Sequence, residues 1–190
     1  MSGENKGAAD GTKTVIHELL NSSLPPEDKG YFRLICEAHT VLGAGLETVG
    51  WSMSVATFYL AQNLDKYNRL HAELKAAFPN ASARLDLLQL EKLPYLYAVI
   101  KESQRLAIGV CRRLPRVFYE PKRYKDWVIP SGTLVSASIP DVHFDEDIFP
   151  DSHAFKPERW LDNAKAPDGA PLDKYICSFS KGPRQCLGIK

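Results

Sequence analysis

Residues 179–188 read FSKGPRQCLG, so that one cysteine follows an arginine at a distance of two positions and is flanked by two glycines. The pattern is F-x-x-G-x-R-x-C-x-G. Glycine adopts backbone conformations closed to other residues, so Gly182 and Gly188 predict a sharply turning loop around Cys186. With each fixed residue type at its ordinary abundance, a chance match anywhere in the chain has a probability of about 10⁻⁵ to 10⁻⁴. We therefore interpret the stretch as a functional loop rather than as a surface loop with a stray cysteine.

A second pattern pairs Glu102 with Arg105 as E-x-x-R, on a helix predicted from Pro94. Residues at this spacing share one helix face, but such pairs are mostly solvated and contribute little. Further along the chain, residues 155–160 read FKPERW and supply another arginine, Arg159. By itself the helical pair is read as a solvated surface pair, and a role for it depends on what the segment at 155–160 adds.

Of two further patterns, one lies upstream of the E-x-x-R pair and the other lies between that pair and the FKPERW segment. Residues 44–48 read AGLET within a long apolar helix, where the alternative is an ordinary packing patch with a hydrogen-bonded threonine. Residues 112–116 read RRLPR and lead into a predicted strand, where the alternative is a solvated basic turn.

These four patterns occur in the order typical of the cytochrome P-450 family, and the chain resembles the C-terminal, haem-binding part of that family over roughly residues 26–190. The resemblance implies a mainly α fold with a small β part. Its expected elements are a long central helix, the E-x-x-R helix, a β-hairpin, an irregular meander and the cysteine-ligand loop. Residues 1–25 are expected to form a loose N-terminal segment.

The resemblance assigns the cysteine loop to haem. Cys186 is implied as the axial thiolate ligand of the iron, which favours O–O cleavage. Arg184 is implied to pair with a haem propionate, and Phe179 to pack beside the thiolate. Gly182 and Gly188 would let the backbone approach the macrocycle closely.

The resemblance also gives roles to the AGLET stretch. Ala44 and Gly45 are implied to leave room for oxygen over the iron. The Thr48 hydroxyl is implied to deliver a proton, with Glu47 as the acid behind it and a local distortion of the helix.

The remaining implied roles belong to the arginines. Arg116 is implied to reach a haem propionate. Glu102, Arg105 and Arg159 are implied to form a buried network. Two arginines and one carboxylate leave net positive charge, so backbone carbonyls must complete it.

Composition excludes several partners. The chain has 190 residues and a net charge of +1, which suggests neither a nucleic acid nor an anionic membrane as partner. Four cysteines form no C-x-x-C pair, and no export signal precedes them, so we expect reduced thiols and an intracellular location. Full-length relatives are typically anchored in the endoplasmic-reticulum membrane, and no such anchor is expected here.

One stretch has the length of a membrane span. Between residues 40 and 61 Glu47 is the only charge, so a transmembrane helix is the alternative interpretation. Because Glu47 and Thr48 are adjacent and three glycines interrupt the stretch, we favour the buried central helix of a larger protein and expect no membrane span.

Periodicity and breakers predict the elements around these patterns. The buried stripe of the E-x-x-R helix is expected at Leu96, Val99, Ile100, Ser103 and Leu106. Helices are predicted from the prolines at 25–26 to about residue 63, from 65 to 78 and from 94 to 106, a strand at 117–119, and a hairpin pairing 127–129 with 133–138. Beyond it lies a proline-rich, irregular stretch.

The implied function is that of a haem-thiolate monooxygenase that inserts one oxygen atom from O2 into a small apolar organic substrate. A reductase would supply electrons at the cysteine side, near Lys174, Lys181 and Lys190. The R-L-P-R turn and the proline-rich meander resemble those of fungal secondary-metabolism members. Family members are considerably longer, so we interpret the chain as a partial sequence or the product of a truncated gene. The alternative is a catalytically inactive fragment that binds haem weakly or serves as an interaction remnant.

Overall fold

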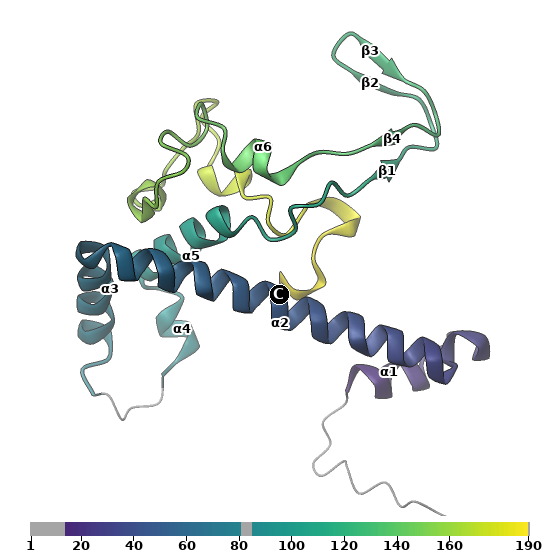
Figure 1. Cartoon of the computed structure of the whole chain (residues 1–190), viewed down its shortest axis with the longest axis horizontal. Helices are drawn as coiled ribbons and strands as arrows, with labels where there is room; N and C mark the ends of the chain where they lie inside the picture. Colours follow the sequence, from purple (N-terminus) through teal and green to yellow (C-terminus); the bar gives the residue numbers. More distant parts are fainter. Residues whose placement is uncertain (1–13, 81–84, 190) are drawn as a thin grey trace, which may run out of the picture. The chain divides into compact units, whose positions relative to one another are not determined.

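The computed structural model describes residues 14–80 and 85–189, which divide within helix α2 into two compact units, one ending at Val49 and one beginning at Gly50. The predicted class, mainly helical with a small β part, is confirmed. The α-helices are α1 (Val15–Asn21), α2 (Tyr31–Gln62), α3 (Leu64–Ala77), α4 (Leu87–Leu90), α5 (Pro94–Ala107) and α6 (Ile139–His143) (Figure 1). The 3-10 helices are η1 (Pro26–Lys29), η2 (Pro157–Trp160), η3 (Leu172–Tyr175), η4 (Gly182–Arg184) and η5 (Leu187–Ile189).

The first unit holds α1, η1 and the first part of α2. Thr14 caps α1, because its hydroxyl oxygen accepts the backbone N–H of His17 at 3.2 Å. The long helix was expected to start at the prolines, but Gly30 is extended after η1, and α2 begins at Tyr31. Of the expected loose segment 1–25, residues 1–13 lie outside the described residues, and the boundary at residue 25 stays a prediction.

Helix α2 was expected to be the buried central helix of a larger protein; in the chain as described it is mostly exposed, and its burial in a larger protein stays a prediction. Val55 is its one buried residue among those described, while Phe32, Leu46 and Met53 are exposed. No helix among residues 14–80 and 85–189 is long and apolar enough to cross a membrane.

Helix α5 starts at Pro94, where the Glu73 carboxylate accepts the N–H groups of Tyr95 and Leu96, each at 2.8 Å. A carboxylate at this end complements the helix dipole. Of the expected buried stripe, Val99 and Ser103 are buried, Leu96 and Leu106 are partly buried against a core cluster, and Ile100 is 46% exposed. The buried side chains of α5 are those of Tyr95, Ala98, Val99, Glu102, Ser103, Arg105 and Ala107.

The β part consists of two antiparallel pairs. Strand β1 (Arg116–Val117) pairs with β4 (Leu134–Val135), and β2 (Lys122–Tyr124) pairs with β3 (Trp127–Ile129) in the outer hairpin of Figure 1. The predicted pairing of residues 127–129 with 133–138 is therefore wrong. Lys125 adopts a positive φ of 51° in the two-residue turn that joins β2 to β3. This turn contains no glycine, so the usual sequence signal for such a turn is missing.

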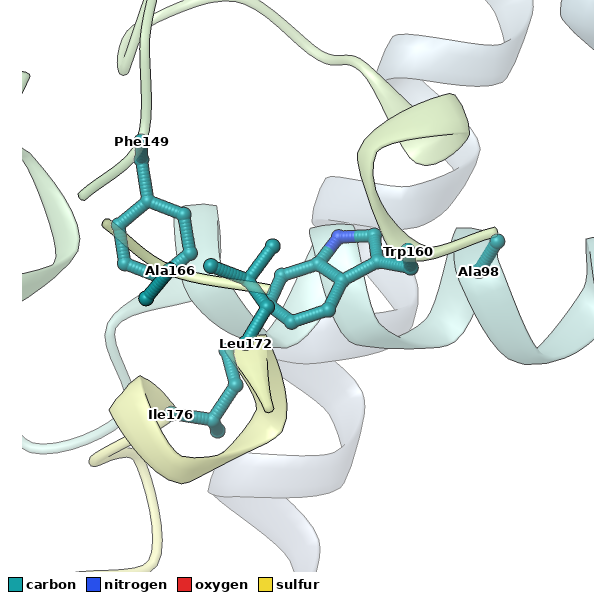
Figure 2. Packing of buried hydrophobic residues seen from close by; sticks show 6 residues of the cluster. All are labelled: Ala98, Phe149, Trp160, Ala166, Leu172 and Ile176. Carbon is teal, nitrogen blue, oxygen red and sulfur yellow. The ribbon is translucent and has the colours of Figure 1, made fainter. Parts of the chain in front are cut away.

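In the core of the second unit, apolar side chains of the irregular segment pack against α5. Phe149 is fully buried and tilts against Trp160, with ring centroids 5.8 Å apart. The cluster drawn in Figure 2 comprises Ala98, Phe149, Trp160, Ala166, Leu172 and Ile176. A second cluster comprises Leu70, Tyr95, Val99 and Phe155. Each large side chain buried in this way contributes about 1.5–3 kcal/mol, which compensates for the missing regular structure.

Candidate functional site

The Glu102–Arg105 pair on α5 is completely buried. The Arg105 Nε donates to Glu102 Oε2 at 2.9 Å, and its second terminal nitrogen donates to Oε1 at 2.8 Å. Both side chains are 0% exposed. The geometry is a two-point contact between a planar guanidinium and a carboxylate, which is stronger and more specific than a single hydrogen bond.

Arg159 of η2 joins this pair. Its Nε donates to Glu102 Oε1 at 3.1 Å, and one terminal nitrogen donates to the carbonyl of Pro150 at 3.0 Å. The Arg105 guanidinium donates in turn to the carbonyls of His143 at 2.7 Å and Ala154 at 3.3 Å. The structure thus brings the three residues of the predicted network together, with backbone carbonyls around the arginines.

Two further donors to Glu102 escaped the sequence analysis. The Trp160 indole N–H donates to Oε2 at 2.9 Å, and the backbone N–H of Lys156 donates to Oε1 at 3.0 Å. The tryptophan at the end of the PERW segment was the available signal, since a buried indole N–H requires an acceptor. Among the described residues, no buried side-chain nitrogen or oxygen lacks a hydrogen-bond partner.

His143, at the end of α6, is a buried residue that the sequence analysis missed, because it lies at the start of a stretch expected to be irregular. Its Nδ1 lies 2.9 Å from the Arg105 carbonyl, and its Nε2 lies 2.9 Å from the backbone N–H of Cys177. A carbonyl accepts and an N–H donates, so the proton belongs on Nδ1. Burial lowers the pKa of His143 to about 4, and the positive charge of Arg105 acts in the same direction, while the Arg105 carbonyl and Glu102 oppose it.

The cysteine loop begins directly after this contact. The Ser178 hydroxyl donates to the Gln104 carbonyl on α5 at 2.9 Å. Further along, the N–H of Cys186 donates to the Phe179 carbonyl at 2.8 Å and closes the loop. Gly182 has a φ of +77°, a conformation that favours glycine, as the pattern predicted.

Cys186 is exposed and forms no disulfide bond. Arg184, Gly182 and Gly188 are exposed beside it, and Phe179 is half-buried. A Cβ added at Gly188 would lie 3.9 Å from Cys186 Sγ, which is an ordinary van der Waals distance.

The AGLET residues lie in the first unit, within α2. Thr48 Oγ1 donates to the Ala44 carbonyl at 2.7 Å, and Glu47 is exposed. An added Cβ at Gly45 would meet no atom within 4 Å. Helix α2 continues through this stretch from Tyr31 to Gln62, and the local distortion expected at Thr48 stays a prediction.

A profile of the cytochrome P450 family matches residues 12–190. The chain belongs to the cytochrome P450 family. It is 42% identical over 184 residues to the cytochrome P450 monooxygenase tpcC of Cochliobolus heterostrophus, covering 93% of this chain and 34% of that protein. It is 46% identical over 178 residues to the monooxygenase sdnE of Sordaria araneosa, with coverage of 93% and 34%. To the monooxygenase TRI4 of Trichoderma arundinaceum it is 40% identical over 186 residues, with coverage of 97% and 36%.

This P450 chain therefore spans about a third of the length of these fungal relatives. The family implies haem with a cysteine ligand, and the residues present fit that group. A pocket of about 410 Å³ adjoins the start of the cysteine loop, with mostly apolar walls and cationic side chains at its edge. Its lining includes Leu114, Phe118, Val135, Arg112, Arg116 and Lys181. Apolar walls suit a porphyrin face, and guanidinium groups suit its propionates. The free thiol of Cys186 suits iron, but Cys177 and not Cys186 is among the residues that line this pocket.

Removal of the central carboxylate should destabilise the P450 fold strongly. We expect Glu102→Ala to lower the free energy of unfolding by about 3–5 kcal/mol, because two arginines remain buried without their shared anion. Urea denaturation measures the loss. The matched control is Glu120→Ala, which removes a carboxylate that is 81% exposed and lies 3.8 Å from Lys122 Nζ. Equal stability of the two variants would contradict the network's role.

Acid should destabilise the fold through His143. The pKa of His143 in the folded chain, about 4, lies below the ordinary value of 6.5. The neutral ring therefore contributes fully to the free energy of unfolding above about pH 6.5, and this contribution is lost as the pH falls towards 4. The loss amounts to roughly 3 kcal/mol at most. Unfolding free energies measured from pH 7 to 4 should fall less steeply in His143→Gln than in the wild type. His153→Gln, at an exposed histidine, should leave the slope of the wild type; a wild-type slope in His143→Gln as well would contradict the prediction.

Proposed function

We propose that this chain is the haem-binding part of a monooxygenase that inserts one oxygen atom from O2 into a small apolar organic substrate. The observation that carries the proposal is the loop bearing Cys186, in which the Cys186 N–H donates to the Phe179 carbonyl at 2.8 Å. The loop starts at Cys177, whose N–H donates to His143 next to Arg105 of the buried network. Haem bound by a thiolate supplies the activation of oxygen.

The residues of the chain bind and orient this group. Cys186 provides the sulfur ligand, and its exposure in the described chain leaves the thiol accessible to iron. Arg116 lines the pocket next to the loop, with one terminal nitrogen donating to the Pro115 carbonyl at 3.0 Å. We assign Arg116 and Arg184 to the propionates, and Phe179, Gly182 and Gly188 to the surroundings of the thiolate.

The AGLET residues complete the proposal. We assign proton delivery to the Thr48 hydroxyl, with Glu47 as the acid that restores the proton, and the space for oxygen to Ala44 and Gly45. The single hydroxyl proton of Thr48 is donated to the Ala44 carbonyl in the described chain, so proton delivery requires the hydroxyl to turn away from that carbonyl.

A reductase is the proposed electron donor. Lys174 and Lys181 are exposed beside the cysteine loop, where they offer positive charge to an acidic partner surface. Lys190, the third lysine of the predicted docking surface, lies outside the described residues.

A second candidate is a polypeptide that binds haem weakly and acts through contacts with other proteins. The exposed apolar side chains of α2, among them Phe32, Leu46 and Met53, favour it, since apolar patches of this kind mark contact surfaces. The carbon monoxide difference spectrum of the reduced protein with added haem separates the two. A thiolate-type band supports the monooxygenase, and its absence supports the second candidate.

The ligand assignment predicts opposite results for two cysteines. Cys186→Ser should abolish the thiolate-type carbonyl band of the haem-loaded protein, because serine does not supply a thiolate. Cys177→Ser is the matched control, and it should keep the band. Burial raises the pKa of the Cys177 thiol, so this sulfur stays protonated and ligates poorly. The reverse result would place the ligand at Cys177.

The proton-delivery assignment predicts uncoupling. In the haem-loaded protein with its reductase, Thr48→Ala should keep the carbonyl band but divert reducing equivalents from product to hydrogen peroxide. The control is Thr40→Ala, because Thr40 Oγ1 makes the same contact in the same helix, donating to the Cys36 carbonyl at 2.7 Å. The ratio of product formed to reductant consumed is the measurement, and an unchanged ratio in Thr48→Ala would contradict the assignment.

A further inference from the structure

His143 connects the buried network to the cysteine loop. Its ring is fully buried, donates from Nδ1 to the Arg105 carbonyl at 2.9 Å and accepts the Cys177 N–H on Nε2 at 2.9 Å. The contact with Arg105 is reciprocal, because the Arg105 guanidinium donates to the His143 carbonyl at 2.7 Å. We propose that His143 is a positioning residue that fixes where the cysteine loop leaves the core, and thereby holds Cys186 in the place that the iron requires. The proposal rests on the haem-thiolate function proposed above.

The loop depends on this contact because most of its other hydrogen bonds are internal. The Ser180 N–H donates to the Cys177 carbonyl and the Cys186 N–H to the Phe179 carbonyl, each at 2.8 Å. Among the described residues, two hydrogen bonds join residues 177–189 to α5 and α6. One is the Cys177–His143 contact, and the other runs from the Ser178 hydroxyl to the Gln104 carbonyl at 2.9 Å. These two contacts attach the start of the loop to α5 and α6, and the Lys181 ammonium also donates to the Lys174 carbonyl in η3.

Only one form of the ring makes both contacts. A neutral imidazole with its proton on Nδ1 presents a donor to Arg105 and an acceptor to Cys177. The charged ring would present a second donor to the Cys177 N–H, and would add positive charge beside Arg105. Glu102, the edge of the Phe149 ring with its centroid 6.5 Å from that of His143, and Cys177 are the other groups close to it. A residue that only fills space would not need a donor at one ring nitrogen and an acceptor at the other, whereas a positioning residue does.

Two substitutions separate the two nitrogens. The amide nitrogen of His143→Asn takes the place of Nδ1 and retains the donor to Arg105, but leaves the Cys177 N–H without an acceptor. The longer His143→Gln carries its amide oxygen to the place of Nε2 and retains the acceptor for Cys177. Because His143→Gln loses the donor to Arg105 in turn, faster exchange of the loop in His143→Asn alone reports the contact with Cys177.

The first readout is amide hydrogen exchange of the full chain, measured by mass spectrometry without haem. We expect residues 177–186 to exchange about tenfold faster in His143→Asn than in the wild type, because a buried N–H loses its acceptor. His143→Gln should stay close to the wild type, and α3 should be unchanged in both. Ser178→Ala, which removes the other attachment, should accelerate exchange in the same residues.

The second readout is the carbonyl complex of the reduced, haem-loaded protein. His143→Asn should convert part of the thiolate-type band to the band of a non-thiolate complex, and His143→Gln should preserve it. Unchanged exchange in His143→Asn would overturn the proposal. Equal acceleration in both variants that extends to α3 would also overturn it, since His143 would then be a packing residue. Failure of the wild type to show a thiolate-type band counts against the haem-thiolate function, while the exchange result still decides the role of His143.

Discussion

The carboxylate of Glu102 must be satisfied completely, because it is removed from water together with two guanidinium groups. Its two oxygens accept from Arg105, Arg159, the indole of Trp160 and the N–H of Lys156. Burial of each ion costs several kcal/mol, which such contacts offset only when the geometry is complete. Two positive charges meet one negative charge, so carbonyl oxygens from the irregular segment have to complete the network. The path of that segment follows from this requirement.

The same constraint explains how a proline-rich segment keeps a defined path. Proline cannot donate to a ladder, and long irregular stretches lack the repeated backbone hydrogen bonds of helices and sheets. Here the carbonyls of His143, Pro150 and Ala154 bond to arginine side chains instead. Phe149 and Trp160 add apolar contacts on the adjoining face (Figure 2). The functional loop then starts from a rigid base, which is the arrangement that a ligand site on a loop requires.

Sequence reasoning was accurate where a residue's partner is another side chain with its own pattern. E-x-x-R and PERW predicted a three-residue cluster that the structure contains, and the helical class and the limits of α3 and α5 agreed within about two residues. It was wrong for Ile100 of α5, an apolar residue of the expected buried stripe that is 46% exposed. It was also wrong for the hairpin, because Lys125 takes a positive φ in the turn, a conformation for which glycine is the usual sequence signal.

His143 marks the boundary of what such reasoning reaches. Its partners are the carbonyl of Arg105 and the N–H of Cys177, and both are main-chain groups. Every residue except proline supplies the same N–H and C=O, so the partners leave no pattern in the sequence. The histidine itself is informative only once α6 and the end of α5 are known to lie beside each other. A charged network can be recognised from its residue types, whereas the link from that network to the loop depends on which backbone atoms meet, and this is decided by the fold.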